Sequence, residues 1–428
     1  MPPSRERSTP LSEAYIIGVG STPFGRHPDR SHASLAGEAV DAALADAGLP
    51  GGSAPIEQVW FGSAAMQSWG QPNIRGQVCL DALLSDGRLP TGTPVINVEG
   101  ACATGSLTLH GAYKDIRSGE HDLVLATGVD KTFLPGDPTA MLALFLGAID
   151  QQDPDRWRAF YTAQAEAHGQ RFSPHPYRIV FIDVHAMQAR HHMAAHGTTA
   201  AQLAAIAAKN HSHGADNPKA QHRTPRDVAA VLADKPVIAP FTRAMCAPIS
   251  DGAAAAVVCS QRWLDGQPPS VQQRAVRIRS SVLQGGRWRD LSTPNLLQAA
   301  AKRAYDRAGL TPKDVDVAEV HDASSFCELQ ATELLGFCDI GSGGVYAAAG
   351  ATSRGGSRPV NLSGGLVSKG HPLAATGLGM IEELATQLRG EAGTRQQPGA
   401  RIGLQHNAGG MIGLDEALCA VHLLEATP

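Results

Sequence analysis

The amino-acid sequence predicts an α/β fold made of two copies of one β-α-β-rich unit, with an insertion in the first copy. Predicted strands and helices alternate along both halves of the chain, which favours sheets that helices cover on both faces. The two halves also share an order of elements and a common sequence motif, and internal similarity on this scale indicates a duplication.

The first elements of the two copies correspond. The first copy begins with a strand predicted over 14–20, a helix over 34–49 that ends near Gly48, and a strand over 56–63. In the second copy the same order of strand, helix and strand recurs over 276–283, 295–310 and 315–324. The two helices end in the similar sequences ADAGL and DRAGL, which supports this alignment.

A motif that begins at an asparagine and closes on Ala-Thr-Gly follows in each copy. NVEGACATG (97–105) in the first copy corresponds to NLSGGLVSKGHPLAATG (361–377) in the second. The region of about 133–245 differs in character, with clustered Pro and Gly and many histidines, so we expect an inserted domain there. We therefore expect an N-terminal half over 1–275, which contains the insertion, and a C-terminal half over 276–428.

The composition excludes several classes of protein. Hydrophobic residues make up 43% of the chain, as in ordinary globular proteins, and the net charge of −4 gives no reason to expect nucleic acid binding. The seven cysteines lack paired spacing, which favours a reducing compartment over a disulfide framework. No run of about 18 apolar residues predicts a membrane span, and the N-terminal segment lacks the apolar core of a secretory signal. We expect a cytoplasmic protein.

Cys102 is the first candidate for chemistry because of its position. It lies between a buried strand predicted over 94–98 and a helix that we expect to end at Gly119. Unpaired N–H groups and the positive end of the dipole at a helix N-terminus favour a thiolate, which is the nucleophilic form. Most lone cysteines are small buried hydrophobic residues, so Cys102 alone does not establish catalysis.

Three histidines of the second copy strengthen the case for Cys102. His321 follows the apolar run VDVAEV, His371 opens a predicted helix, and His406 follows the strand ARIGL. Each adjoins the end of an element, where functional loops of α/β sheets gather. If the copies pack about a pseudo-twofold axis, we expect these connections and that of Cys102 to converge on one pocket.

A further histidine pair does not predict a metal site. His192 and His196 are four residues apart on a predicted helix, a spacing that can bind zinc. The glutamate of an HEXXH motif and a third ligand are both missing. We therefore expect no bound metal.

Taken together, the motifs resemble those of the thiolase superfamily. EGACATGS, HDAS, GGLVSKGHPLAATG, QHNAGG and SDGAAAAVV carry the resemblance, which extends over nearly the whole chain. The combination of HD and HN-x-G is similar to sterol-carrier-protein-type and archaeal thiolases, whereas the better-known enzymes have NEAF and C-x-G motifs. The resemblance implies the thiolase fold, a duplicated five-layer αβαβα arrangement with an inserted loop domain.

The resemblance also implies a role for each residue of these motifs. Cys102 attacks an acyl carbonyl and holds the acyl group as a thioester, while His371 takes its proton as general base. His321 and His371 stabilise the enolate oxygen of the second thioester. Backbone N–H groups near Cys102 and at Ala408 or Gly409 form the other oxyanion hole.

The second acid/base, which moves the proton at the α-carbon, departs from the family patterns. His406 stands where C-x-G thiolases have a cysteine, and Ala323 stands where some sterol-carrier-type relatives have the cysteine of HDCF. His406 is therefore our candidate for this role, with Cys327 as the alternative.

The implied function is an acyltransferase that cleaves a 3-oxoacyl-CoA with coenzyme A (CoA), or catalyses the reverse Claisen condensation, through an acyl-Cys102 intermediate. CoA is then a co-substrate, and no permanently bound cofactor is expected. Basic residues of the insertion could meet the CoA phosphates, among them Lys209, Lys219, Arg223 and Arg243.

Thiolases pair as dimers, so the resemblance also implies a homodimer or a dimer of dimers. Two alternatives remain open for the activity. The first is an aldolase-type lyase that cleaves a 3-hydroxyacyl-CoA without an acyl-enzyme. The second is a subunit that is active only with a small OB-fold and zinc-ribbon partner.

Overall fold

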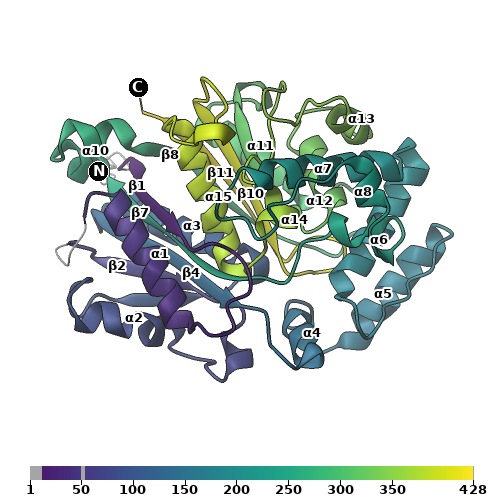
Figure 1. Ribbon diagram of the computed structural model, residues 1–428, viewed down its shortest axis with the longest axis horizontal. Coiled ribbons are helices and arrows are strands. Elements are labelled where there is room, and N and C mark those ends of the chain that lie inside the picture. Colours follow the sequence, from purple (N-terminus) through teal and green to yellow (C-terminus); the bar gives the residue numbers. More distant parts are fainter. Residues whose placement is uncertain (1–11, 50–53, 428) are drawn as a thin grey trace, which may run out of the picture.

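The computed structural model describes residues 12–49 and 54–427, and its centre is a sheet of nine strands (Figure 1). The strands of this sheet are β1 (Ala14–Ser21), β2 (Gln58–Gly62), β3 (Val95–Val98), β4 (Leu123–Lys131), β7 (Asp251–Ser260), β8 (Val276–Gly285), β9 (Val317–Val320), β10 (Ile402–Gly409) and β11 (Leu418–Ala426). Their order across the sheet is β3-β2-β4-β7-β1-β8-β11-β10-β9.

The two halves of the sheet repeat one strand order outward from the centre, where β1 pairs antiparallel with β8. From β1 outward the order is β7, β4, β2 and β3, and from β8 outward it is β11, β10 and β9. Beyond β9, an isolated parallel bridge joins Ala318 to Val360, at the place that β3 takes beside β2 in the first half. Asn97 and Asn361, which begin the two predicted motifs, therefore occupy equivalent places in the topology.

Helices cover both halves and separate them, which gives the five-layer αβαβα order that the resemblance implies (Figure 1). The first outer layer is α1 (His32–Asp46) with α2 (Arg75–Ser85), the central layer is α3 (Thr104–Ser118) with α15 (Leu373–Leu388), and the second outer layer is α11 (Leu296–Ala308) with α12 (Ser325–Leu334). Separate hydrophobic clusters join each outer layer to its half of the sheet, and a third cluster surrounds the central helices.

The segment between β4 and β7 forms a largely helical subdomain, drawn in teal in Figure 1. It consists of α4 (Pro138–Leu146), α5 (Pro154–Ala167), α6 (Val180–His196), α7 (Ala200–Ala215), α8 (Val228–Leu232), β5 (Pro236–Ile238) and β6 (Phe241–Thr242). Helix α7 packs against α12, α13 (Gly343–Ala348) and α14 (Gly365–Lys369). The insertion thus contacts the segments that adjoin His321 and His371. Two short helices, α9 (Gln261–Asp265) and α10 (Pro269–Arg274), link β7 to β8.

Two sequence predictions about individual elements are wrong. The strand predicted as buried over 94–98 forms, but its residues are half-buried, because β3 is an edge strand of the sheet. The sequence also predicts that the QHNAGG motif follows its strand, yet residues 405–409 continue β10 and pair with β11, so that His406 lies opposite Val421. Antiparallel pairing with the long strand β11 keeps this segment extended up to Gly409.

No helix among residues 12–49 and 54–427 is both long enough and apolar enough to cross a membrane. The segment in which we expect no secretory signal lies mostly in residues 1–11, outside the described residues.

Candidate active site

Cys102 lies in a 3-10 turn, η2 (Ala101–Ala103), between β3 and α3. Ala101 has a φ of 50°, a left-handed conformation that costs free energy for any residue except glycine. Hydrogen bonds hold this turn: the Glu99 carboxylate accepts from the Ala101 N–H, and the Thr104 hydroxyl donates to the Ala101 carbonyl at 2.7 Å. The backbone that carries the thiol is therefore fixed before any substrate binds.

The protonation state predicted for Cys102 is wrong. Burial, with smaller contributions from the neighbouring carboxylates of Asp130 and Glu99, raises the pKa of its thiol to about 12. A hydrogen bond from the Cys102 backbone N–H favours the thiolate, but it does not offset the burial. The free protein therefore holds a neutral thiol at pH 7, and a base must take its proton during the reaction.

His321 and His371 lie next to Cys102. The sulfur of Cys102 and one ring nitrogen of each histidine are within 4.8 Å of one another, and the two ring centroids are 5.1 Å apart. Burial lowers the pKa of His371 to about 3, so its imidazole is neutral and can accept a proton. A thiol beside a neutral imidazole is the arrangement that nucleophilic catalysis requires.

Hydrogen bonds from two other elements orient His371. Its Nδ1 lies 2.8 Å from the Thr376 hydroxyl on α15, and its backbone N–H donates to the Ser250 hydroxyl at 2.9 Å. The Thr376 hydroxyl also reaches the Pro372 carbonyl, so Thr376 can accept from an Nδ1–H of His371. That tautomer leaves Nε2 free to act as the base.

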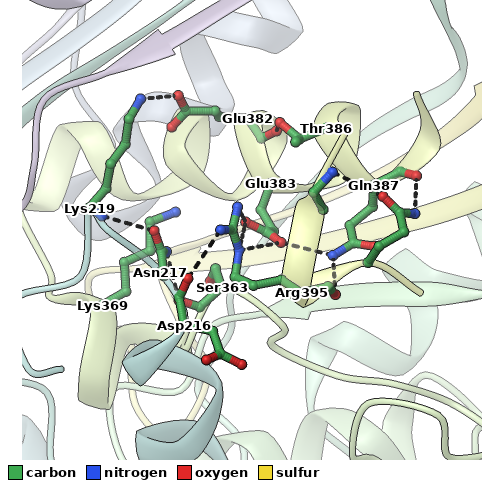
Figure 2. Close-up of polar contacts among 12 residues, drawn as sticks. Asp216, Asn217, Lys219, Ser363, Lys369, Glu382, Glu383, Thr386, Gln387 and Arg395 are labelled. Carbon is green, nitrogen blue, oxygen red and sulfur yellow. Dashed lines mark hydrogen bonds and ion pairs between the residues drawn. The ribbon is translucent and has the colours of Figure 1, made fainter. Parts of the chain in front are cut away.

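Polar contacts behind His371 hold the loop between α14 and α15. Lys369 is buried and donates to the Gly379 carbonyl at 2.6 Å, near the carboxylates of Glu319 and Glu383. Figure 2 shows Lys369 beside the ion pair between Arg395 and Glu383, whose nitrogen and oxygen are 3.0 Å apart. These contacts fix the Ser-Lys-Gly-His segment against α15.

A buried network also holds the end of β9, where His321 lies. Asp322 accepts hydrogen bonds from the Leu366 N–H at 2.6 Å and from the Asn210 amide at 2.8 Å. Asn210 also donates to Glu328, which forms a buried ion pair with Lys209 at 2.7 Å. Helix α7 of the insertion therefore positions the HD motif.

The pKa of His321 is well below its usual range, because its imidazole is buried and lies near the rings of His371, His406 and His185. Burial alone lowers the pKa of His406 to about 3. Nδ1 of His321 and Nδ1 of His406 are buried and have no hydrogen-bond partner among the described residues. Both imidazoles are thus neutral and available to a substrate.

Strand β10 brings Gly409 against the backbone of η2. A Cβ at Gly409 would lie 2.2 Å from the Gly100 carbonyl oxygen and 2.8 Å from the Cys102 nitrogen. Only glycine fits this contact. The close approach places the backbone of β10 next to the nucleophile.

All of the predicted site residues line one pocket with an empty volume of about 860 Å³. The four side chains are those of Cys102, His321, His371 and His406, joined by Ala408 and Gly409.

Sequence analysis missed several residues that support or line the site. Asp130 accepts hydrogen bonds from the Ser63 hydroxyl at 2.6 Å and from the Ala374 N–H at 2.8 Å, and so ties β4 to the start of α15. Burial raises its pKa to about 6. Thr376 lies in the GHPLAATG motif and Ser250 in the SDGAAAAVV motif, but no role was predicted for either residue. His185 and Glu416 line the pocket but belong to no motif.

The basic residues proposed for CoA differ in their availability. Lys209 forms a buried ion pair with Glu328 and cannot reach a phosphate in solution. The expectation that Lys209 could contact the CoA phosphates is therefore wrong. Lys219 pairs with Glu382, and Arg243 pairs with Asp234. Arg223 is exposed, and among the described residues it forms no ion pair.

The described residues contain one group with metal-ligand spacing, and it is the Cys102, His321 and His371 cluster itself. His192, the first residue of the other candidate pair, uses both ring nitrogens: Nδ1 lies 3.0 Å from the Thr198 hydroxyl and Nε2 lies 3.1 Å from Glu333. The expectation that the chain binds no metal stays a prediction.

Comparison with known proteins supports the resemblance. The family model "Thiolase, N-terminal domain" matches residues 14–225, and "Thiolase C-terminal domain-like" matches residues 279–419. An acetyl-CoA acetyltransferase of Methanothermobacter thermautotrophicus is 36% identical over 96% of this chain and 99% of its own length. Sterol carrier protein 2 of Homo sapiens is 34% identical over 93% of this chain and 70% of its own length. Benzoylsuccinyl-CoA thiolase subunit BbsB of Thauera aromatica is 31% identical over 93% of this chain and 95% of its own length.

Solved structures show the same fold. The Ltp2-ChsH2(DUF35) aldolase matches with a TM-score of 0.75 at 22% identity, over 98% of this chain and 99% of that one. Human mitochondrial 3-ketoacyl-CoA thiolase matches with a TM-score of 0.67 at 18% identity, over 98% of this chain and 100% of that one. The family models cover most of the chain, and the relatives match it along nearly its whole length. The chain therefore belongs to the thiolase family of acyl-CoA C-acyltransferases.

Proposed function

We propose that this acyltransferase cleaves a 3-oxoacyl-CoA with CoA, or catalyses the reverse Claisen condensation, through an acyl thioester on Cys102. The observation that carries the proposal is the position of the Cys102 sulfur, within 4.8 Å of a ring nitrogen of both His321 and His371, in one pocket.

In the first half-reaction the Cys102 thiol passes its proton to Nε2 of His371, and the sulfur attacks the 3-oxo carbon of the substrate. The bond between the α- and β-carbons then breaks, which leaves the acyl group on Cys102 and releases the enolate of acetyl-CoA. N–H groups of His321 and His371 stabilise the enolate oxygen. Protonation of the enolate carbon, by His406 or by Cys327, gives acetyl-CoA.

In the second half-reaction the thiol of CoA attacks the acyl group on Cys102. The group that protonated the enolate, His406 or Cys327, accepts the proton of CoA, and His371 returns the proton that it took from Cys102 to the sulfur as it leaves. The products are the shortened acyl-CoA and the free thiol of the enzyme. Backbone N–H groups at Cys102 and Gly409 would stabilise the tetrahedral oxyanion, because the two segments of backbone are in contact. Arg223 is our candidate for a contact with the CoA phosphates.

Two features keep the aldolase reaction as a second candidate. Ala323 lines the pocket where HDCF enzymes have a cysteine, so a thiol at that place is missing. The Ltp2-ChsH2(DUF35) complex with this fold is named as an aldolase. In an aldolase reaction a 3-hydroxyacyl-CoA would break into an aldehyde or ketone and acetyl-CoA, without an acyl-enzyme and without free CoA.

We further propose that the chain acts as a homodimer, alone or with a small partner. The names of two matching proteins support the small partner, because one is a thiolase subunit and the other is a complex with a DUF35 protein. Activity that appears only after addition of a co-purified small protein would identify the partner-dependent form.

Intact-mass measurement tests the thiolase proposal. The purified protein is incubated with a panel of acyl-CoAs and 3-oxoacyl-CoAs, and its mass is recorded. We expect an acyl-sized gain that Cys102→Ala abolishes, while Cys327→Ala retains it. A gain that persists in Cys102→Ala would overturn the acyl-Cys102 intermediate. Release of an aldehyde or ketone from a 3-hydroxyacyl-CoA, with no mass gain, would favour the aldolase reaction.

A further inference from the structure

A second group of polar side chains lines the same pocket and has no part in the chemistry described above. His185 comes from α6, Asn295 from the N-terminus of α11, and Glu416 from the loop between β10 and β11. None of these positions adjoins Cys102, His321 or His371 in the sequence.

Asn295 fixes the position of Glu416. Its side-chain oxygen accepts from the Leu297 N–H at 2.8 Å and caps α11, and its amide donates to Oε2 of Glu416 at 3.0 Å. Among the described residues, no donor lies within hydrogen-bond distance of Oε1 of Glu416, and this residue forms no ion pair. Glu416 therefore offers an oriented acceptor that the protein itself does not use.

His185 is likewise left without a partner. Its Nδ1 is buried without a hydrogen bond, and neither ring nitrogen has a partner among the described residues. Burial lowers its pKa to about 4, against the opposing influence of the Glu416 charge, so the ring is neutral at pH 7. A neutral imidazole offers one donor and one acceptor.

The rest of the lining beside these groups is mostly apolar, with Gln330 and Cys327 as the polar exceptions. Phe181 and Ile182 precede His185 on α6. Leu297 follows Asn295 by two residues on α11, and Met411 lines the same pocket. A buried polar group that stays unpaired costs free energy, so an occupant with only hydrocarbon here is disfavoured. An occupant with a carboxylate is also disfavoured, because it would face the carboxylate of Glu416.

We propose that His185 and Glu416 form a polar wall that selects an acyl group bearing a neutral hydroxyl remote from its thioester. The hydroxyl donates to Oε1 of Glu416 and accepts from an N–H of His185, while the hydrocarbon part of the acyl group packs on Phe181 and Met411. The inference rests on the proposed function, since it assumes that the acyl group of a CoA thioester enters this pocket.

Matched acyl-CoAs test the polar wall. Linear acyl-CoAs from butanoyl to dodecanoyl are prepared in three forms: unsubstituted, with a terminal hydroxyl, and with a terminal carboxylate. The rate at which each one acylates Cys102 is followed by intact mass. At the chain length that reaches the wall, we expect the hydroxylated form to react about tenfold faster than either of the other two forms. Acylation at equal rates by all three forms would overturn the inference and leave the acyl-Cys102 intermediate intact.

Variants of the wall separate recognition of the acyl group from recognition of CoA. His185→Phe removes both ring nitrogens and keeps the size of the ring, and Glu416→Gln removes the charge. We expect His185→Phe to bring the rate ratio of hydroxylated to unsubstituted substrate close to one, and Glu416→Gln, which keeps an acceptor but removes the charge, to raise the rate of the carboxylate form. His196→Phe on the same helix and Glu166→Gln on α5 are matched controls outside the pocket and should keep the wild-type ratio.

Failure of the inference and failure of the proposed function give different results in this experiment. A loss of rate by the same factor for every acyl-CoA would show that the wall binds the amide groups of the pantetheine arm, and would overturn the inference. Failure of every thioester to acylate the wild-type protein would instead contradict the proposed function. Thermal unfolding of each variant establishes that it is folded before rates are compared.

Discussion

Cys102 and His371 are both neutral in the free protein, because burial disfavours the charged form of each. It raises the pKa of the thiol to about 12 and lowers that of the imidazole to about 3. The two groups therefore do not form a thiolate–imidazolium pair before substrate binds. Proton transfer must accompany the attack of sulfur, and the rate then depends on how well His371 is oriented.

The reactivity of Cys102 toward a small alkylating agent tests this protonation state. Only the thiolate reacts, and its fraction rises tenfold for each unit of pH below a raised pKa. We expect the alkylation rate by iodoacetamide to increase without a plateau from pH 6 to about 10, as measured by intact mass. A plateau that begins below pH 7 would instead reveal an ion pair and contradict the raised pKa.

Thr376 is expected to control the orientation of His371. Thr376→Val removes the hydroxyl that lies 2.8 Å from Nδ1, and the ring can then adopt the wrong tautomer. We expect acylation of Cys102 to slow about tenfold to a hundredfold, with the lost rate in turnover rather than in KM, as for other positioned bases. Thr386→Val is a matched control on the same helix, because its hydroxyl also bonds a carbonyl one turn back, at 2.7 Å. Equal losses in both variants would indicate a general effect on α15.

At the scale of elements, the site is built where β10 meets the turn that carries Cys102. Gly409→Ala would place a methyl group 2.2 Å from the Gly100 carbonyl oxygen, so either β10 or η2 must move. We expect a loss of about 1–3 kcal/mol in the free energy of unfolding and a slower acylation of Cys102. Gly285→Ala at the end of β8 meets nothing within 4 Å and should leave both properties unchanged. Wild-type stability and acylation in Gly409→Ala would contradict the contact.

The insertion positions His321 through the buried pair of Lys209 and Glu328. Lys209→Met leaves the Glu328 charge without its cation, and the loss of one partner from such a pair typically costs about 3–5 kcal/mol. Adding Glu328→Gln removes the stranded charge, so the double variant should regain a large part of the loss. Chemical denaturation of the wild type and both variants measures this. A double variant less stable than Lys209→Met would show that the unpaired charge of Glu328 is not the main cause of the loss.

The elements of this fold could be predicted from local patterns, whereas parts of the site could not. The runs that form β1, α1 and β7 carry their periodicity and end signals in the sequence itself, and the motifs located all four candidate side chains. The protonation state of Cys102 could not be predicted, because a helix terminus is a local feature, while burial depends on the packing of distant segments. His185 and Glu416 carry no motif, and only the fold brings them to the pocket.

At the scale of the whole molecule, buried histidines make stability depend on pH. Seven histidines have a pKa of about 3 or 4, and burial is the largest cause of each lowered value. They are His32, His110, His185, His213, His371, His406 and His422. The unfolded chain binds protons on these groups near pH 6.5, and the folded protein does not. Their contribution to stability is therefore present above pH 6.5 and is lost as the pH falls toward 4. Burial also raises the pKa of four carboxyl groups, those of Asp130, Asp183, Glu319 and Asp322, which act in the opposite direction but are outnumbered by the seven histidines.

His422 allows this dependence to be tested away from the pocket, because it is fully buried in β11 and does not line the site. We expect the free energy of unfolding, measured by urea denaturation, to fall steeply between pH 6 and pH 5. His422→Leu removes one of the groups that titrate only after unfolding, so the slope should decrease by about 1.4 kcal/mol per pH unit. His168→Leu changes an exposed histidine and should keep the wild-type slope. An unchanged slope in His422→Leu would show that His422 is protonated in the folded protein, contrary to its burial.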